Sequence, residues 1–315
     1  GLGASSAVTD NDRFINESRV TLDKTGNEDA VVSNEGSITA KESGLVGFVA
    51  PRVENSGVIT ARLGRVHLAS GEKATVDFYG DGLLEVAVGD EVKHQLVKNT
   101  GTINAQGGTI ALTAAAGRKL LSSSIEVDGA LNAQTVSEHE GRIIISAEGK
   151  NAVAGNIAAN KNNGNSNVAS KVSVGGTLNA EGKNTGEKGG KISITADEIS
   201  LKSTAKVSSK GAAGGGVIHI GGEYLGLGST PTARTTFIES GAVIDASASE
   251  QGHGGEVIVF ADGDTIFNGL IYANGAGILG NGGFVETSGK ARLHIGGAVE
   301  AKASGGGAAG EWLLD

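Results

Sequence analysis

A unit of two short segments, each led by glycine and each alternating apolar with other residues, recurs along this chain and constrains its fold. In the clearest copy, Gly57-Val58-Ile59-Thr60-Ala61 is followed by Gly64-Arg65-Val66-His67-Leu68-Ala69. The last copies are evenly spaced, because 269 − 241 and 297 − 269 both give 28 residues. A fixed period of this length is typical of a solenoid. The other copies begin at Gly36, Gly101, Gly129, Gly176, Gly241, Gly269 and Gly297.

The alternation within each segment predicts β-strands rather than helices. It places Ile59 and Ala61, or Ile192 and Ile194, on one face of a strand. Glycine also interrupts nearly every window before a helix could complete three turns. Each repeat is too small for a core of its own, so equivalent strands must pair between successive coils. The sequence therefore predicts an all-β fold, a single parallel β-helix over residues 1–315, with about ten to twelve coils and a length of roughly 50–60 Å.

The composition agrees with a thin core threaded along a rod. The 315 residues include 53 Gly but only 2 Pro, and aromatic residues make up 3%. The net charge of −9 argues against a nucleic-acid partner or an anionic membrane surface. No apolar run approaches the roughly 18 residues of a membrane span, so no membrane insertion is expected. The sequence has no Cys, and it has neither Met nor a signal peptide, from which we expect a piece of a longer chain.

Several stretches depart from the repeat. Residues 1–33 are predicted to form one irregular first coil with loops. A long gap between two copies holds two strand-like runs, 74–78 and 83–88, which predict an additional coil. Residues 151–170 are polar and low in complexity, and residues 224–236 lack alternation, so both are predicted to be loop excursions.

Three early copies carry Asn two residues before the glycine, at Asn34, Asn55 and Asn99. Stacked Asn side chains can hydrogen-bond to one another and to the backbone at a turn. The corner is predicted to become apolar further along the rod. Later copies have these residues at the same position: Val127, Val174, Phe267 and Ile295.

Four segments carry a resemblance to a known family. They are VENSGVITARLGRVHLASGEKATVDFYGDGLLEVAV (53–88), HGGEVIVFADGDTIFNGLIYANG (253–275), GGFVETSG (282–289) and EWLLD (311–315). These segments resemble the large exoproteins of two-partner secretion, the filamentous-haemagglutinin and high-molecular-weight-adhesin group, and the resemblance covers almost the whole chain. It implies a right-handed parallel β-helix that an outer-membrane transporter exports. It also implies a secreted or cell-surface location in a Gram-negative bacterium, and a role as an adhesin or an extracellular fibre, including in biofilm.

One departure from the family concerns the export motif. The export domain of the family carries Asn-Pro-Asn motifs, whereas the only prolines here are Pro51 and Pro231, and neither stands in such a motif. We therefore expect the chain to begin downstream of those motifs, in the tail of that domain. The partners implied by the resemblance are the transporter during export, and a host receptor, a matrix glycan or other cells.

Two short motifs suggest chemistry but lack companions. Gly252-His253-Gly254 is similar to a fragment of the polygalacturonase site, yet the sequence has no Asn-Thr-Asp, Asp-Asp or Arg-Ile-Lys motif, so a glycine-rich turn is favoured. Asp262-Gly263-Asp264 and Asp81-Gly82 could supply oxygens to Ca²⁺, which takes about six or more ligands. No acidic cluster adjoins either pair, and a simple turn is favoured.

The six histidines show no close pairing of the kind that binds a metal. Those in mid-strand, His67, His219 and His294, are expected to point outward into solvent. The full set is His67, His94, His139, His219, His253 and His294. The glycine-rich runs 211–216 and 275–277 follow no strand-to-helix pattern, so phosphate binding is not expected.

The local basic cluster consists of Arg52, Arg62, Arg65 and Lys73. An outward strand face interleaved with acidic residues is favoured there over a site for an anion or a glycan. The low aromatic content also weakens the case for a sugar-stacking groove. The aromatic residues that could contribute locally are Phe78, Tyr79 and Trp312.

Two classes of function therefore remain, with an enzyme acting on polysaccharide a distant third. One is an adhesin segment that serves as a rigid stalk or binding surface, and the other is a self-assembling structural fibre subunit. The terminal segments GLGAS and AAGEWLLD are strand-like and uncapped, which leaves end-to-end self-association open. The resemblance favours the adhesin. No catalytic, cofactor-binding or metal-binding residue is predicted, and no enzymatic activity is expected.

Overall fold

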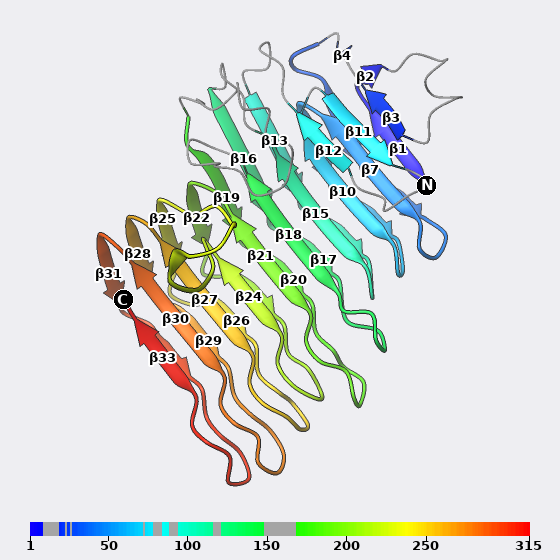
Figure 1. Cartoon of the computed structure of the whole chain (residues 1–315). Helices are drawn as coiled ribbons and strands as arrows, with labels where there is room; N and C mark the ends of the chain where they lie inside the picture. Colours follow the sequence, from blue (N-terminus) through cyan, green and yellow to red (C-terminus); the bar gives the residue numbers. More distant parts are fainter. Residues whose placement is uncertain are drawn as a thin grey trace.

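A computed structural model describes residues 1–8, 19–22, 24–25, 27–71, 73–77, 84–87, 94–115, 121–147 and 168–315. In this part of the chain, three long parallel sheets wind into a β-helix, and its two termini lie at opposite ends (Figure 1). The described residues contain no α-helix and a single 3-10 turn, η1 (Tyr224–Gly226). The prediction of an all-β parallel β-helix is confirmed.

Sheet 1 is the longest sheet, with ten strands in the order of the chain. Its strands are β1 (Leu2–Ser5), β7 (Leu45–Ala50), β10 (Arg65–Ser70), β15 (Thr109–Ala114), β18 (Arg142–Ala147), β21 (Lys191–Thr195), β24 (Val217–Ile220), β27 (Glu256–Ala261), β30 (Phe284–Gly289) and β33 (Glu311–Leu314).

Sheets 2 and 3 have nine strands each, and both are parallel throughout. Sheet 2 contains β5 (Val31–Asn34), β8 (Arg52–Asn55), β13 (His94–Asn99), β16 (Ser122–Val127), β19 (Ser170–Val174), β22 (Glu198–Leu201), β25 (Thr235–Ile238), β28 (Asp264–Phe267) and β31 (Arg292–Ile295). Sheet 3 contains β6 (Ser37–Thr39), β9 (Val58–Thr60), β14 (Thr102–Asn104), β17 (Ala130–Asn132), β20 (Thr177–Asn179), β23 (Lys206–Ser208), β26 (Val243–Asp245), β29 (Leu270–Tyr272) and β32 (Ala298–Glu300).

Each complete rung passes through sheet 2, sheet 3 and sheet 1 in turn, as in β8–β9–β10. The described residues form nine such rungs, and β1 pairs with β7 ahead of the first. At the ~4.8 Å spacing between strands this stack is about 40 Å long. The prediction of ten to twelve coils and 50–60 Å was therefore too high for the described part of the chain.

The additional coil predicted from residues 74–78 and 83–88 is wrong. Strands β11 (Lys73–Asp77) and β12 (Leu84–Ala87) pair antiparallel with each other, and β11 also pairs antiparallel with β3 (Arg19–Leu22). These strands form a small sheet outside the helix, in which β12 lies against β10 of sheet 1. Alternation predicts a strand, but it cannot distinguish parallel pairing between coils from a local antiparallel hairpin.

One rung was missed because its corner residue is not glycine. The rung β22–β23–β24 has Ala205 where most copies have the leading glycine, and the next rung has Ala242 there. Both alanines are buried. Gly269 is the equivalent residue of the following rung, and a Cβ there would lie 2.8 Å from the Ala242 carbonyl oxygen. A Cβ at Gly101 would lie only 2.1 Å from the Gly57 carbonyl oxygen. The corner is therefore wider at Gly269 than at Gly101.

The remaining irregular stretches lie partly outside the described residues. Within the predicted first coil, residues 1–33, the short strands β2 (Ala7–Val8) and β4 (Lys24–Thr25) pair antiparallel. Of the predicted loop 151–170, residues 151–167 lie outside the described part, and Ser170 already belongs to β19. The predicted loop 224–236 opens with η1, and its last two residues belong to β25.

The core is a set of aliphatic columns that run along the helix. The inward column of sheet 3 consists of fully buried side chains, such as Ile59, Ile103 and Leu131. Ile192 and Ile194 of sheet 1 are also fully buried, so the predicted inward face of these strands is confirmed. In-register pairing, for example Ile103 with both Ile59 and Leu131, places like side chains over one another at each step.

Two columns of glycine mark the corners on either side of sheet 3. In the first, a Cβ at Gly101 would lie 2.1 Å from the carbonyl oxygen of Gly57 in the preceding rung. In the second, a Cβ at Gly108 would lie 2.0 Å from the carbonyl oxygen of Gly64. Real Cβ atoms do not approach backbone oxygens so closely. The repeated glycines thus allow successive coils to stack at both corners.

The predicted asparagine ladder is confirmed. The Asn34 side-chain amide donates to Asn55 Oδ1 at 2.8 Å, and the Asn55 amide donates to Asn99 Oδ1 at 2.7 Å. All three side chains are buried. In the next rung Val127 pairs with Asn99, and it is fully buried. The corner therefore changes from polar to apolar at this step, as predicted.

We predict that Gly101→Ala destabilises the protein by about 2 kcal/mol or more, because the new methyl group forces two rungs apart. Gly36→Ala is the matched control. Gly36 stands in the same column on the first rung, and a Cβ there would meet no atom within 4 Å. Urea unfolding of the two variants should show a loss of stability only for Gly101→Ala. Equal stabilities would show that the corners are not close-packed.

The asparagine ladder gives a second prediction. Asn55→Val should cost about 1–3 kcal/mol, because it leaves the Asn34 donor and the Asn99 acceptor without their partner. Replacing Asn34, Asn55 and Asn99 together by Val should cost less than the single change, since no member of the ladder then loses a partner. Denaturant titration of both variants tests this order, and a triple variant less stable than Asn55→Val would contradict it.

Candidate interaction surface

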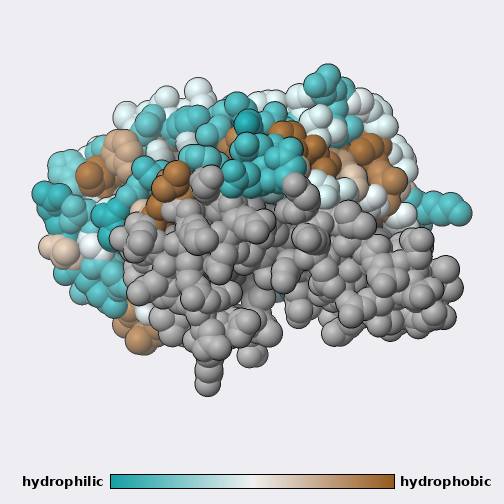
Figure 2. Space-filling view, turned by 90° about the horizontal axis from the view of Figure 1, so that it is seen from above, coloured by the Kyte–Doolittle hydropathy of each residue, from teal (hydrophilic) through white to brown (hydrophobic). Residues whose placement is uncertain are grey.

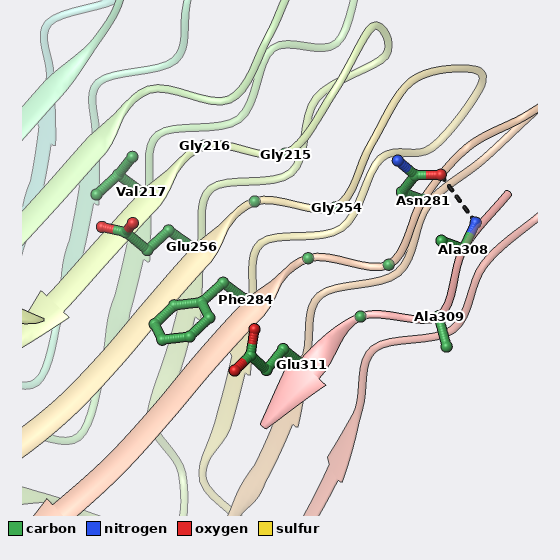
Figure 3. Close-up of a pocket in the computed structure, with 14 residues that line it drawn as sticks. Gly215, Gly216, Val217, Gly254, Glu256, Asn281, Phe284, Ala308, Ala309 and Glu311 are labelled. Carbon is green, nitrogen blue, oxygen red and sulfur yellow. Dashed lines mark hydrogen bonds between the residues drawn. The ribbon is translucent and has the colours of Figure 1, made fainter. Parts of the chain in front are cut away.

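A shallow depression of about 530 Å³ lies where the loops from sheet 3 enter sheet 1. Its floor is bare backbone, and the side chains of Glu256, Phe284 and Glu311 line one side (Figure 3). The floor residues are Gly215, Gly216, Gly254, Gly255, Gly282, Gly283 and Gly310.

The glycines of the floor close the bases of the loops. The Gly255 N–H donates to the Ala246 carbonyl at 2.7 Å, and the Gly283 N–H donates to the Ala273 carbonyl at 2.7 Å. A Cβ at Gly254 would lie 2.0 Å from the Ala273 oxygen. The loops are also tied to one another, since Asn281 Oδ1 accepts the Ala308 N–H at 2.9 Å (Figure 3). The floor is therefore a fixed backbone surface.

The Glu256 carboxylate beside the depression is suited to binding rather than to acid catalysis. Glu256 Oε1 lies 2.6 Å from His219 Nε2, and this hydrogen bond, with the positive charge of Lys191 as a smaller contribution, lowers the pKa of Glu256. Cleavage of a glycosidic bond needs a carboxyl group whose pKa is raised. The pKa of Glu256 is shifted in the opposite direction.

A strap formed by residues 221–234 covers the outer face of sheet 1 beside the depression. The Tyr224 ring packs edge-on against Phe284, with centroids 5.7 Å apart. The Leu225 N–H donates to both carboxylate oxygens of Glu286, at 3.2 and 3.1 Å. The Ser288 hydroxyl donates to the same fully buried carboxylate at 2.7 Å, so its charge is hydrogen-bonded rather than isolated.

One expectation about the histidines is wrong. His219 was expected to be solvated, but it is buried on the outward side of β24, where it contacts Glu256. On the neighbouring strand β27 the outward residues Ile258 and Phe260 are fully buried as well. Strand alternation assigns a face, and it does not indicate whether another segment covers that face.

The prediction that His67 is solvated is also wrong. His67 is half-buried, and its Nε2 lies 2.9 Å from Thr113 Oγ1 on the adjacent strand β15. Burial lowers the pKa of the imidazole from 6.5 to about 4. His294 is exposed, as expected.

The other histidines take part in structural contacts. The exposed His253 accepts the Asn281 N–H at its Nδ1, at 2.9 Å, which ties its turn to the next loop. His94 Nδ1 lies 2.9 Å from the Ser122 hydroxyl, and the backbone of His139 pairs with Val136. Among the described residues there is no group of three or more His, Cys, Asp or Glu that could hold a metal ion.

The candidate calcium ligands are paired with cations. Asp262 accepts a hydrogen bond from Lys290 at 2.8 Å and another from Thr232. Asp264 forms an ion pair with Arg292. The other candidate, Asp81-Gly82, lies outside the described residues. The glycine-rich runs 211–216 and 275–277 lie in the loops that enter sheet 1.

The predicted basic cluster does not form one site. Arg52 pairs with Glu54 at 2.9 Å, and Arg62 pairs with Glu42. Arg65 lies on the outer face of sheet 1. The side chains of Lys73, Phe78 and Tyr79 lie outside the described part, and Trp312 donates to Thr287 Oγ1 at 3.0 Å.

In the view from above Figure 1, the described part of the surface is mainly hydrophilic. Figure 2 shows hydrophobic residues there in small separate patches among polar ones, over the part of this view that is described. A docking face for an obligate partner would be a larger continuous patch. No helix in the described part of the chain is long and apolar enough to cross a membrane.

His67 gives a prediction about pH. Its folded pKa of about 4 lies below the unfolded value of 6.5, so the unfolded chain binds more protons between these values. The contribution of His67 to stability is therefore fully present above pH 6.5 and is lost as the pH falls towards about 4. We expect His67→Gln to flatten the decline in stability over this window, whereas His94→Gln, at an exposed site, leaves it unchanged. Unfolding measured against pH checks this, and parallel curves for His67→Gln and the wild type would refute it.

Comparison with known proteins identifies the family. No family model matches the chain, and no curated protein matches it. The crystal structure of the HMW1 secretion domain from Haemophilus influenzae is similar to it, with a TM-score of 0.77 and 30% sequence identity. The match covers 100% of this chain and 74% of that one. Since the likeness extends over every rung of the β-helix, the chain belongs to the family of two-partner secretion exoproteins.

Proposed function

We propose that this chain is a segment of an exported adhesin, which passes through an outer-membrane transporter and stands at the bacterial surface as a rigid stalk and binding surface in attachment or biofilm. The observation that supports this most is the match of the whole chain to a secretion domain at 30% identity. Both the export of this chain and its role in adhesion are part of this proposal.

Two properties of the chain suit export in an unfolded state. The sequence has no Cys, so no disulfide can form before passage through the transporter. Each rung contacts mainly its neighbours, so folding can proceed rung by rung as the chain emerges. Every added rung buries side chains such as Ile103, Ile110 and Leu112, which favours forward movement.

The shape suits a stalk. The aliphatic core runs through all nine rungs, and exposed charges on sheet 2 are paired, as in Lys171–Glu198 at 3.1 Å. Sheet 2 therefore presents a solvated surface. The outer face of sheet 1 is more varied. It carries the depression, the strap and cations that form no ion pair within the described residues, and we assign contact with a receptor, a matrix glycan or another cell to it.

The test is export of the parent exoprotein from a Gram-negative host with and without its outer-membrane partner. We expect the protein in the medium only when the transporter is present. Gly101→Ala should lower the exported amount, because stacking outside the cell is impaired, while Gly36→Ala should match the wild type. Equal amounts in the medium with and without the transporter would refute the proposal.

A self-assembling fibre subunit is a second candidate, because the rungs stack along one axis and a further copy of the chain could continue the parallel sheets. Electron microscopy of the purified chain separates the two functions. Short single rods agree with the stalk, and long filaments would replace it with the fibre.

A further inference from the structure

Three cations stand in one outward row on sheet 1. The strand register aligns the first residues of successive strands, so that Arg65 pairs with Thr109, Thr109 with Arg142, and Arg142 with Lys191. Arg65, Arg142 and Lys191 are exposed. We call Arg65, Thr109, Arg142 and Lys191 the basic row.

The basic row differs from the cations on sheet 2, which face carboxylates. Arg65 and Arg142 form no ion pair with any residue in the part of the chain that the structure describes, and neither does Lys191, although its charge contributes to the lowered pKa of Glu256. Cations on and beside sheet 2 pair with acidic residues: Arg52 with Glu54, Lys98 with Glu126, Lys171 and Arg234 with Glu198, Lys202 with Asp128, and Arg292 with Asp264.

The arrangement is unfavourable for the protein alone. Arg142 and Lys191 lie directly opposite each other on paired strands, and like charges in that position destabilise a sheet. The chain is acidic, with a net charge of −9, and it neutralises cations elsewhere with carboxylates. An anionic ligand laid across the strands would relieve this repulsion.

The surface beside the row is partly apolar. The next outward row on the same strands carries His67, Ala111, Ile144 and Ser193. Ile144 is 39% exposed, so an apolar surface adjoins the charges. From Arg65 to Lys191 the row spans three strand steps, about 14 Å along the helix axis. Beyond Lys191 the row continues with Val217 and then Glu256, whose negative charge would end an anionic site.

We propose that the basic row binds an acidic polysaccharide, with the sugar chain running along the helix axis across β10, β15, β18 and β21. The guanidinium groups of Arg65 and Arg142 can each hold a carboxylate or sulfate group through two hydrogen bonds. Lys191 adds a third positive charge, and the apolar face of a sugar ring can lie on Ile144. This deepens the proposed adhesive function, because it names the chemical class of the partner.

The test compares two variants of equal charge in the purified chain. Arg142→Gln/Lys191→Gln removes two charges of the row, and Lys171→Gln/Lys206→Gln removes two exposed charges from sheets 2 and 3. The probes are a fluorescent heparin oligosaccharide, a polygalacturonate oligosaccharide of similar length, and neutral dextran. Melting temperatures measured in parallel confirm that each variant is folded.

We expect heparin, polygalacturonate or both to bind the wild type, and the binding to weaken at high salt. Affinity should fall by about tenfold or more in the row variant and less than about threefold in the control. The two oligosaccharides distinguish recognition of sulfate from recognition of carboxylate. Dextran should not bind.

Several outcomes would overturn the proposal. These are no binding of either acidic oligosaccharide, an equal loss in the row and control variants, or equal binding of dextran. Tighter binding to single-stranded DNA or to anionic lipid vesicles than to both oligosaccharides would also overturn it, because the row would then serve another class of partner. Failure of the export test leaves this measurement unaffected, since it uses purified protein.

Discussion

The fixed spacing between stacked coils is the constraint on which the rest of the structure depends. Parallel pairing sets successive rungs ~4.8 Å apart along three sheets at once, so every corner must repeat at the same pitch. At Gly101 and Gly108 this leaves no room for a Cβ, which would lie 2.1 and 2.0 Å from a carbonyl oxygen of the preceding rung. The glycine columns therefore determine where the chain can turn. The core columns of Ile, Leu and Val follow, because each turn places the next strand in register with the last.

At the corner between sheets 1 and 2, successive coils are held together by hydrogen bonds from side-chain hydroxyls to backbone carbonyls. The Ser70 hydroxyl donates to the Pro51 carbonyl at 2.6 Å, and Thr236 and Thr265 donate to the carbonyls of Phe260 and Ser288 at 2.8 and 2.7 Å. All three hydroxyl side chains are buried. They satisfy carbonyls where the chain changes direction and leaves the sheet ladder. These buried hydroxyls lie beside strands whose inward residues are mainly aliphatic.

The outer face of sheet 1 differs from one part of the β-helix to the next. Near its start β12 lies against β10, and towards its end the strap is held by the buried Glu286 carboxylate. Between them the cations of the basic row remain exposed. A rigid scaffold that holds charges in register loses little conformational freedom on binding, which favours recognition of a repeating polymer. The proposed export and the proposed adhesion are compatible in one chain, because the same stacking would drive folding outside the cell and stiffen the proposed stalk.

The sequence by itself determined the fold class, the inward face of strands such as β9 and β21, and the asparagine ladder. Those features depend on local alternation, on glycine spacing and on contacts between equivalent positions of neighbouring repeats, all of which can be read from the chain. It did not determine the antiparallel pairing of β11 and β12, the rung with Ala205 at its corner, or the burial of His67 and His219. It also did not show that Arg65, Arg142 and Lys191, which are 77 and 49 residues apart in succession, stand in one row. Only the tertiary structure decided these, because they depend on which segments cover an outward face and on the register across several coils, and alternation within a strand carries no information about either.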